Sequence, residues 1–134
     1  MIQYMLDTNM IAYAKNRNPE RALENLQRHD PSEICISAIT MAELEFGIFN
    51  SSRPERNRIA LMMFLSDIII MPFDADAALA YGDIRHELKV RGELIGANDL
   101  LIAAHARSLD VILVTHNTRE FSRVDGLKLE DWTM

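Results

Sequence analysis

The alternation of short apolar runs with longer amphipathic segments constrains the fold of this chain more than any other feature of its sequence. The short runs are rich in β-branched and aliphatic residues, and the longer segments carry apolar residues at three- and four-residue steps. We expect strands at 2–6, 33–37, 68–73, 111–115 and 127–129. Strands that alternate with helices build βαβ units, so the pattern predicts an α/β fold with a mostly parallel sheet of four to five strands, covered by helices on both faces.

Capping and breaking residues mark where the helices begin and end. We expect helices at 10–14, from Pro19, at 39–49, from Pro54, at 75–91 and after Asn98. Asp74 is expected to cap the long helix 75–91 and Gly92 to close it, while Asn98 is expected to cap the helix that follows. The run 68–73 is apolar throughout, which is typical of a parallel strand buried on both faces.

Two of these helices carry apolar stripes, and we expect the aromatic residues of the first stripe to pack in the core. The first stripe consists of Ile39, Ala42, Phe46 and Phe49, and the second contains Ile59, Met62 and Met63. Contact with a second copy of the chain or with a partner helix is the alternative for Phe46, Phe49 and Tyr81. His105 is expected to be a hydrogen-bonded helix residue rather than a metal ligand, because the four histidines lack the spacing of a metal pair.

Composition is that of an ordinary globular protein. The 134 residues fit a single domain over 1–134, with 49% hydrophobic and 25% charged residues. The lone Cys35 cannot form an internal disulfide, no signal peptide is recognisable, and no apolar run approaches the roughly 20 residues that cross a bilayer. We therefore expect a cytoplasmic protein without membrane contact. The net charge of −6 argues against broad nucleic-acid binding unless basic residues gather locally.

Acidic residues fall where proteins of this architecture bind ligands, beyond the carboxyl ends of the strands. Asp7 directly follows the first expected strand, Glu43 borders the apolar stripe of helix 39–49, and Asp99 begins the helix after Asn98. Taken singly, each is equally well explained by capping, by a solvated helix face or by the helix dipole. Carboxylates drawn into one cleft repel each other unless a cation neutralises them. Because oxygen ligands select hard ions, the joint placement predicts a Mg²⁺ or Mn²⁺ site.

Four segments resemble, in order and spacing, the acidic motifs of PIN-domain proteins. They are MLDTN at 5–9, T-x-A-E-L at 40–44, G-x-N-D-L-L-I-A-A-H-A at 96–106 and V-T-H-N-T-R-E-F at 114–121. The closing segment G-L-x-L-E-D-W at 126–132 resembles the tail of VapC toxins, so the resemblance covers essentially the whole chain. It implies a three-layer α/β/α fold and a Mg²⁺- or Mn²⁺-dependent endoribonuclease, the toxin of a type II toxin–antitoxin pair.

Carried over residue by residue, the resemblance implies a set of catalytic and metal-binding residues. They are Asp7, Glu43, Asp99 and Glu120. Many PIN domains have an aspartate where this chain has Asn117, so Glu120 takes the fourth acidic position and Asn117 a neutral or water-mediated one. The family's supporting polar positions match Thr8, Asn9 and Thr115.

The resemblance also implies partners. The substrate would be RNA, with tRNA as the expected class and the initiator tRNA as the narrower expectation, and its cleavage would inhibit translation and growth. A VapB antitoxin would neutralise the toxin, the chain would form a homodimer and a toxin–antitoxin hetero-oligomer, and DNA would be bound only through the antitoxin. Basic residues around the acidic site would bind the RNA backbone, and the candidates are Arg85, Lys89, Arg91 and Arg119.

Two other classes of function stay open at this point. A catalytically weak or inactive PIN-like module that binds RNA or protein would have the same fold, and Asn117 in place of an aspartate is compatible with it. A phosphotransfer domain or phosphatase also places an aspartate after its first strand. It needs either D-x-D there or an acidic pair just upstream, whereas this chain has D-T-N at 7–9 and no acidic residue at 2–6.

Overall fold

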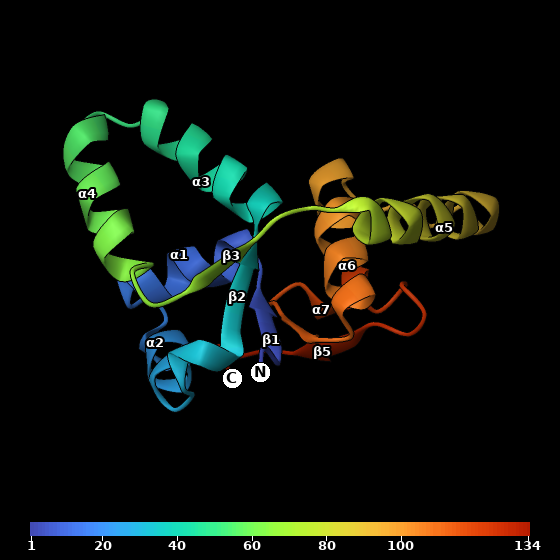
Figure 1. Ribbon diagram of the computed structural model, residues 1–134, viewed down its shortest axis with the longest axis horizontal. Helices are drawn as coiled ribbons and strands as arrows, with labels where there is room; N and C mark the ends of the chain where they lie inside the picture. Colours follow the sequence, from blue (N-terminus) through green and yellow to red (C-terminus); the bar gives the residue numbers. More distant parts are fainter.

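A parallel sheet of five short strands runs through the middle of the molecule, and the computed structural model describes residues 1–134 (Figure 1). The strands are β1 (Tyr4–Leu6), β2 (Ile34–Ser37), β3 (Ile69–Met71), β4 (Ile112–Val114) and β5 (Lys128–Glu130). Their order across the sheet is β3-β2-β1-β4-β5, and every neighbouring pair is parallel. The predicted α/β fold with a parallel sheet is confirmed.

Seven helices connect the strands and cover the two faces of the sheet. They are α1 (Thr8–Asn16), α2 (Glu20–Gln27), α3 (Ala38–Phe49), α4 (Pro54–Phe64), α5 (Ala75–Arg91), α6 (Ala97–Leu109) and α7 (Thr118–Phe121). In Figure 1, α3 and α4 form an arm on one side of the sheet, and α5 and α6 lie on the other side. None of the helices has both the length and the apolar composition of a membrane span.

Side chains alternate along the central strands and divide the core into two apolar clusters. In β1, Met5 belongs to the cluster with α5, α6 and α7, whereas Leu6 belongs to the cluster with α1, α2, α3 and α4. In β4, Leu113 and Val114 repeat this division. Because successive residues of a strand point to opposite faces, both faces of the sheet are apolar and both need a layer of helices. This is the three-layer arrangement that the resemblance implied.

The caps predicted for the long helix are confirmed. Asp74 Oδ1 accepts a hydrogen bond of 3.0 Å from the N–H of Ala77 at the start of α5. At the other end, Gly92 adopts a left-handed conformation with φ of 68°, which a residue without Cβ adopts at little cost. These two local signals place both ends of α5 where the sequence predicted them.

The prediction that 68–73 is a strand buried on both faces is wrong. The strand β3 covers only Ile69–Met71 and lies at the edge of the sheet, with β2 as its single partner. Ile70 is 46% exposed. A continuous apolar run is expected both in central strands and in short edge strands of such a sheet, and the order of the strands decides between them.

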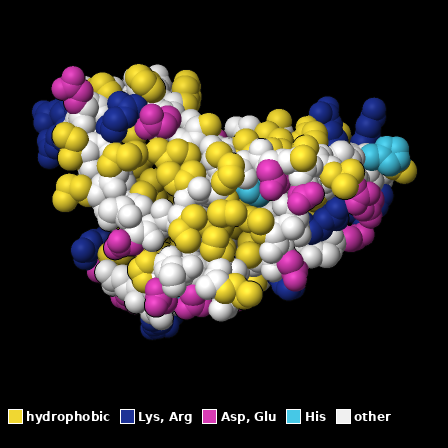
Figure 2. Space-filling model, in the orientation of Figure 1, with side chains coloured by type: hydrophobic (Ala, Val, Ile, Leu, Met, Phe, Trp, Pro, Cys, Tyr) yellow, Lys and Arg dark blue, Asp and Glu magenta, His cyan; other side chains and the backbone are white.

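The apolar stripe of α3 is also largely outside the core, contrary to prediction, and the apolar stripe of α4 is exposed too. Phe46 is 70% and Phe49 71% exposed, and Ile59, Met62 and Met63 are exposed as well. The buried apolar residues of the two helices are instead Ile48 and Leu61. The helices pack on each other in an arm, and each keeps an exposed apolar side (Figures 1 and 2). Periodicity identifies an apolar face and does not identify what covers it.

Two isoleucines that face each other in the register of β2 and β3 test this account of the sheet. Ile36 is fully buried and lies opposite Ile70. We expect Ile36→Ala to lower the free energy of unfolding by about 2–5 kcal/mol, the range for truncation of a buried isoleucine. The matched variant Ile70→Ala should cost no more than about 1 kcal/mol. Urea denaturation of both variants measures the difference, and equal losses would contradict the edge position of β3.

Candidate active site

The order of the strands reverses at β1. The chain passes from β1 to β2 and β3 on one side, then returns to β4 and β5 on the other side. In open parallel sheets the ligand crevice lies outside the carboxyl ends of the strands at such a switch point. Asp7 follows β1 and Thr115 follows β4, and the N–H of Asp7 donates to the carbonyl of Val114 at 3.1 Å. The switch point therefore carries the first of the predicted acidic residues.

Asp7 is held rigidly at this edge. It is the N-cap of α1, and its Oδ1 accepts a 2.8 Å hydrogen bond from the N–H of Met10. Only 5% of the residue is exposed. Burial raises the pKa of Asp7 to about 6, the charges of Asp99 and Glu43 add to the rise, and hydrogen bonds from Thr115 and Met10 oppose it. A carboxylate that is costly to ionise lies at the centre of the switch point.

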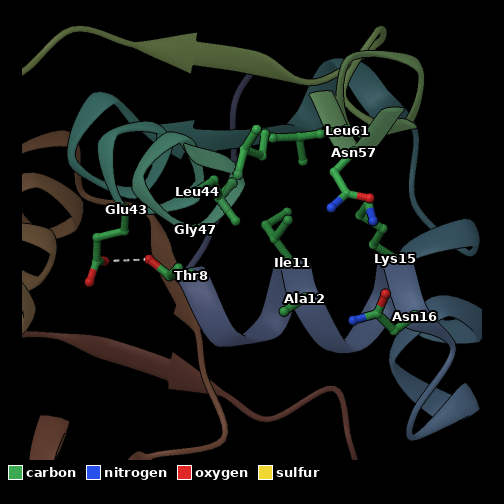
Figure 3. Close-up of a pocket in the computed structure, with 11 residues that line it drawn as sticks. Thr8, Ile11, Ala12, Lys15, Asn16, Glu43, Leu44, Gly47, Asn57 and Leu61 are labelled. Atoms are coloured by element: carbon green, nitrogen blue, oxygen red, sulfur yellow. Dashed lines mark hydrogen bonds between the residues drawn. The ribbon is translucent and has the colours of Figure 1, made fainter. Parts of the chain in front are cut away.

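Glu43 reaches the same edge from α3. The helix begins directly after β2, where Ser37 Oγ accepts a 3.0 Å hydrogen bond from the N–H of Ile39. Thr8 Oγ1 donates to Glu43 Oε1 at 2.5 Å, and this contact is drawn in Figure 3. Asn98 Nδ2 donates to the other oxygen, Oε2, at 3.2 Å. The carboxylate of Glu43 is thus bridged to α1 on one side and to α6 on the other.

Asp99 and Glu120 complete the acidic group. Asp99 lies in the first turn of α6 and Glu120 in the short helix α7. The pKa of Asp99 is raised by burial first and then by repulsion from Glu43 and Glu120. Since the charge of Asp99 also acts on Asp7, Asp99 lies within electrostatic reach of the other three predicted carboxylates.

The chemistry of this donor set fits a divalent cation, although the side chains are not yet arranged around one point. The donors are carboxylate oxygens, which prefer hard ions such as Mg²⁺ and Mn²⁺. No group of three His, Cys, Asp or Glu side chains is arranged to hold a metal ion. Glu43 points both oxygens at Thr8 and Asn98. Because an ionised carboxylate has about four lone-pair sites, one hydrogen bond on each oxygen leaves Glu43 with free acceptor capacity for an ion.

The predicted supporting residues have different positions in the structure. Thr8 contacts Glu43 directly, whereas Asn9 is exposed on the first turn of α1. Thr115 is buried, and its Oγ1 accepts a 2.9 Å hydrogen bond from the N–H of Asn117. Asn117 is the N-cap residue of α7, but its side chain makes no capping bond. Of the four, Thr8 and Thr115 touch or adjoin the carboxylates.

The prediction that Asn98 caps α6 is wrong. The helix begins at Ala97 with Gly96 in the N-cap position, and there is no side-chain cap. The amide of Asn98 turns to Glu43 instead. A capping role is a local property that the sequence suggests by default, whereas the contact with Glu43 joins residues 55 positions apart. The sequence held no signal for it beyond the polar character of Asn98.

His105 is a satisfied buried helix residue, as predicted. Its Nδ1 lies 2.7 Å from Ser37 Oγ, and its ring packs edge-on against Phe73. Burial lowers the pKa of His105, which favours the neutral imidazole. Ser37 was not singled out from the sequence, yet its hydroxyl joins the start of α3 to α6. These are the helices that carry Glu43 and Asp99.

A groove of about 480 Å³ opens beside Glu43, between α1, α3 and α4 (Figure 3). Glu43 and Thr8 lie at one end of the groove, and Lys15 and Asn57 lie at the other end. Between the ends the lining is mostly apolar, with Ile11, Leu44, Ile48 and Leu61. The acidic edge therefore continues into an apolar channel along α1.

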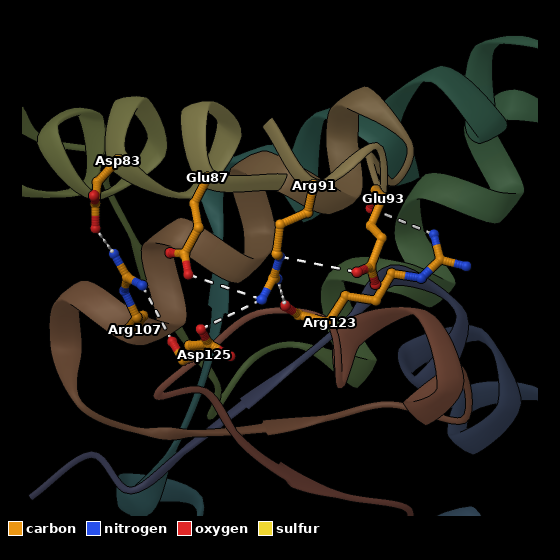
Figure 4. A network of polar contacts seen from close by, with 7 residues as sticks. All are labelled: Asp83, Glu87, Arg91, Glu93, Arg107, Arg123 and Asp125. Atoms are coloured by element: carbon orange, nitrogen blue, oxygen red, sulfur yellow. Dashed lines mark hydrogen bonds and ion pairs between the residues drawn. The ribbon is translucent and has the colours of Figure 1, made fainter. Parts of the chain in front are cut away.

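The basic residues predicted to bind RNA fall into two groups. Arg91 lies in a network with Glu87, Glu93, Asp125 and the backbone carbonyl of Arg123 (Figure 4). The remaining three are exposed and make no ion pair; they are Arg85, Lys89 and Arg119. The guanidinium of Arg85 lies over the ring of Tyr81 and donates to its hydroxyl. Arg91 thus stabilises the contact between α5 and the loop after α7.

Known proteins match this chain along almost its whole length. A family model described as PIN domain matches residues 4–127. Ribonuclease VapC2 of Haemophilus influenzae is 44% identical over 98% of this chain and 99% of its own length. The tRNA(fMet)-specific endonuclease VapC of Shigella flexneri is 42% identical over 99% of this chain and 100% of its own length.

Solved structures agree with this result. A crystal structure of DNA-bound VapBC from Salmonella typhimurium contains a chain with a TM-score of 0.92 and 39% identity, covering 98% of this chain and 99% of that one. The fold and the acidic switch point define an α/β protein of the PIN type. The chain belongs to the PIN domain family and, within it, to the VapC ribonuclease family.

Asp7 gives a test of the electrostatics of this site. Folding raises the pKa of Asp7, so this residue contributes its full stability only while it is neutral, below its ordinary pKa of 3.8. The contribution is lost as the pH rises through the folded-state pKa of about 6. We expect Asp7→Asn, which keeps a capping side chain, to stabilise the metal-free protein by roughly 3 kcal/mol above pH ~6.5. At pH ~4 the gain should be small.

Chemical denaturation in the presence of a chelator at both pH values measures this difference. Asp76→Asn is the matched control, because Asp76 is exposed in the first turn of α5. Its effect on stability should stay within about 0.5 kcal/mol at both pH values. If the gain in stability of Asp7→Asn does not change with pH, burial of the ionised Asp7 carboxylate does not destabilise the folded protein.

Proposed function

We propose that this protein is a metal-dependent endoribonuclease and the toxin of a type II toxin–antitoxin pair. The observation that carries the proposal is the gathering of Asp7, Glu43 and Asp99 at the switch point of the sheet, where their charges act on one another. Relatives that are 44% and 42% identical carry the names ribonuclease and tRNA(fMet)-specific endonuclease. We therefore take RNA as the substrate, tRNA as its class and the initiator tRNA as the first candidate.

The acidic residues would hold Mg²⁺ or Mn²⁺. When bound, the ion supplies a water of lowered pKa and polarises the scissile phosphate. Asp7 is kept in place for this role by the N–H of Met10, and Glu43 by Thr8 and Asn98. We assign the fourth acidic role to Glu120, because its charge acts on Asp99.

Binding of the RNA backbone falls to basic side chains outside the acidic edge. Phosphates are repelled by carboxylates, and counterion release at Lys and Arg supplies much of the affinity for nucleic acid. Arg85, Lys89 and Arg119 are exposed and available for this role. Arg91 is a weaker candidate, since its guanidinium is taken up by Glu87, Glu93 and Asp125.

The partner that we propose is a VapB-type antitoxin. The similar chain from Salmonella typhimurium is part of a DNA-bound VapBC structure, so we expect contact with DNA only through the antitoxin. The α3–α4 arm exposes Phe46, Phe49 and Met63, and large exposed apolar surfaces are typical of protein interfaces. In Figure 2, hydrophobic side chains gather over this arm and in the hollow beside it. A homodimer would cover part of the exposed apolar surface.

Replacement of one carboxylate tests the nuclease. We expect Asp99→Asn to lower RNA cleavage in Mg²⁺ or Mn²⁺ by more than about 100-fold, which exceeds the 10–100-fold typical of residues that only support a metal ligand. The fold should be kept, as measured by circular dichroism. The substrate is purified initiator tRNA, alongside total bacterial RNA with mapping of the new 5′ ends. The exposed carboxylate variant Asp76→Asn should cleave like the wild type.

If Asp99→Asn cleaves RNA at the wild-type rate, the assignment of the site is wrong. If the wild type neither cleaves RNA nor binds Mn²⁺ in the low-millimolar range, the protein belongs to the inactive PIN-like class. Asn117, a neutral residue at the acidic edge, is the observation that makes this second class worth testing.

Growth of a bacterial host tests the toxin. Induced expression of the wild-type chain should arrest growth, because cleavage of tRNA stops translation. Expression of Asp99→Asn to the same level should not arrest growth, and Asp76→Asn should arrest it like the wild type. Arrest by the inactive variant would point to toxicity from aggregation or from binding alone.

A further inference from the structure

Glu43 is the one acidic residue of the site whose two oxygens are both tied to other side chains. Oε1 accepts from Thr8 Oγ1 at 2.5 Å, and Oε2 accepts from Asn98 Nδ2 at 3.2 Å. Thr8 opens α1, Glu43 lies in α3 and Asn98 lies in the first turn of α6. The two hydrogen bonds thus form a bridge across three helices that meet at the carboxyl edge of the sheet.

No interaction within its own helix turn explains the direction of the Asn98 side chain. An asparagine beside a helix start usually bonds to the free N–H groups of the first turn. Here the helix starts at Ala97, Gly96 occupies the N-cap, and no side chain caps the helix. The amide of Asn98 contacts Glu43 and gives up the capping role. The tertiary contact therefore determines where this side chain points.

The bridge lies where the site needs a donor. Asn98 is next in sequence to Asp99, and Glu43 and Asp99 repel each other. A neutral amide donor at the start of α6 attracts the carboxylate of Glu43 toward the helix that carries Asp99, without adding a competing charge. Thr8 fixes the other oxygen from the side of Asp7. Truncation of Asn98 would leave Oε2 without its side-chain partner and widen the range of rotamers open to Glu43.

We propose that Asn98 is a positioning residue of this site, which holds Glu43 close enough to Asp99 for the two carboxylates to share a divalent cation. The proposal rests on the proposed function. Asn98 acts through Glu43 and is assigned no contact with the substrate. It forms one bridge with Thr8, so the two residues should act in the same direction.

The test measures Mn²⁺ affinity directly, by calorimetric or electron-paramagnetic titration of the purified protein. We expect Asn98→Ala to weaken Mn²⁺ binding about 10–100-fold, the range for loss of a side chain that supports a metal ligand. Asn98→Gln, which keeps an amide on a longer arm, should recover part of the affinity. At limiting Mn²⁺ the variant should lose kcat with little change in the KM for RNA, and saturating Mn²⁺ should restore much of kcat.

A double-mutant cycle separates positioning from direct contact. In the background of Glu43→Gln, the substitution Asn98→Ala should cause little further loss of Mn²⁺ affinity, because the carboxylate through which Asn98 acts is already gone. A full additional loss would mean that Asn98 acts on the ion or the RNA without Glu43, which overturns the proposal. Mn²⁺ affinity of Asn98→Ala within twofold of the wild type would overturn it as well.

Asn25→Ala is the matched control. Asn25 Nδ2 makes a comparable hydrogen bond between a helix and another segment, to the carbonyl of Trp132 at 2.7 Å, outside the site. Its truncation should lower the Tm and leave the Mn²⁺ affinity unchanged. Asn98→Ala should instead lower the Mn²⁺ affinity and leave the Tm unchanged. If the wild type neither binds Mn²⁺ nor cleaves RNA, the proposed function and this role both fail. If it does both while Asn98→Ala equals it, only the positioning role fails.

Discussion

Repulsion among carboxylates at one edge of the sheet is the constraint around which this structure is built. Asp7 is nearly excluded from solvent, and its ionised form is opposed by burial and by the charges of Asp99 and Glu43. An apolar core cannot relieve this cost, because it supplies no donors. Relief comes from the N–H of Met10 for Asp7, and from Thr8 and Asn98 for Glu43. A carboxylate set held together only by such donors is well suited to a cation, which is a stronger partner than any of them.

The parallel sheet makes this concentration of charge possible. All five strands end at the same edge, and the reversal of strand order at β1 leaves a crevice there. The N-termini of α1 and α6 also lie at this edge, so the positive ends of two helix dipoles face the carboxylates. The buried contact between Ser37 and His105 connects the start of α3 to α6. Core, helix ends and buried polar contacts thus support the same cluster.

Local signals in the sequence predicted much of the fold, but they did not predict which apolar segments are exposed to solvent. The caps Asp74 and Gly92 act within one turn of α5, so the sequence predicts them whatever the surrounding tertiary structure. The run 68–73 is apolar, but it lies at an edge of the sheet. The stripe that ends in Phe49 is apolar as well, but it lies on the projecting α3–α4 arm. Asn98 was given a local role because its true partner is far away in the chain. Asp7 was found because it directly follows a strand, and the other acidic residues because they match the PIN-domain motifs.

The sequence by itself determined the alternation of strands and helices, the layers that cover both faces of the sheet, and the chain positions of Asp7, Glu43, Asp99 and Glu120. The strands, helices and layers depend on the period of apolar residues and on residues that act within a turn or two. The acidic positions were given by the resemblance to the PIN-domain motifs. Only the tertiary structure decided which apolar faces are covered, that Arg91 is engaged by acidic neighbours, and that Asn98 and Thr8 hold Glu43 between three helices. Such contacts join residues far apart in the chain, and their geometry exists only after the helices have packed on the sheet.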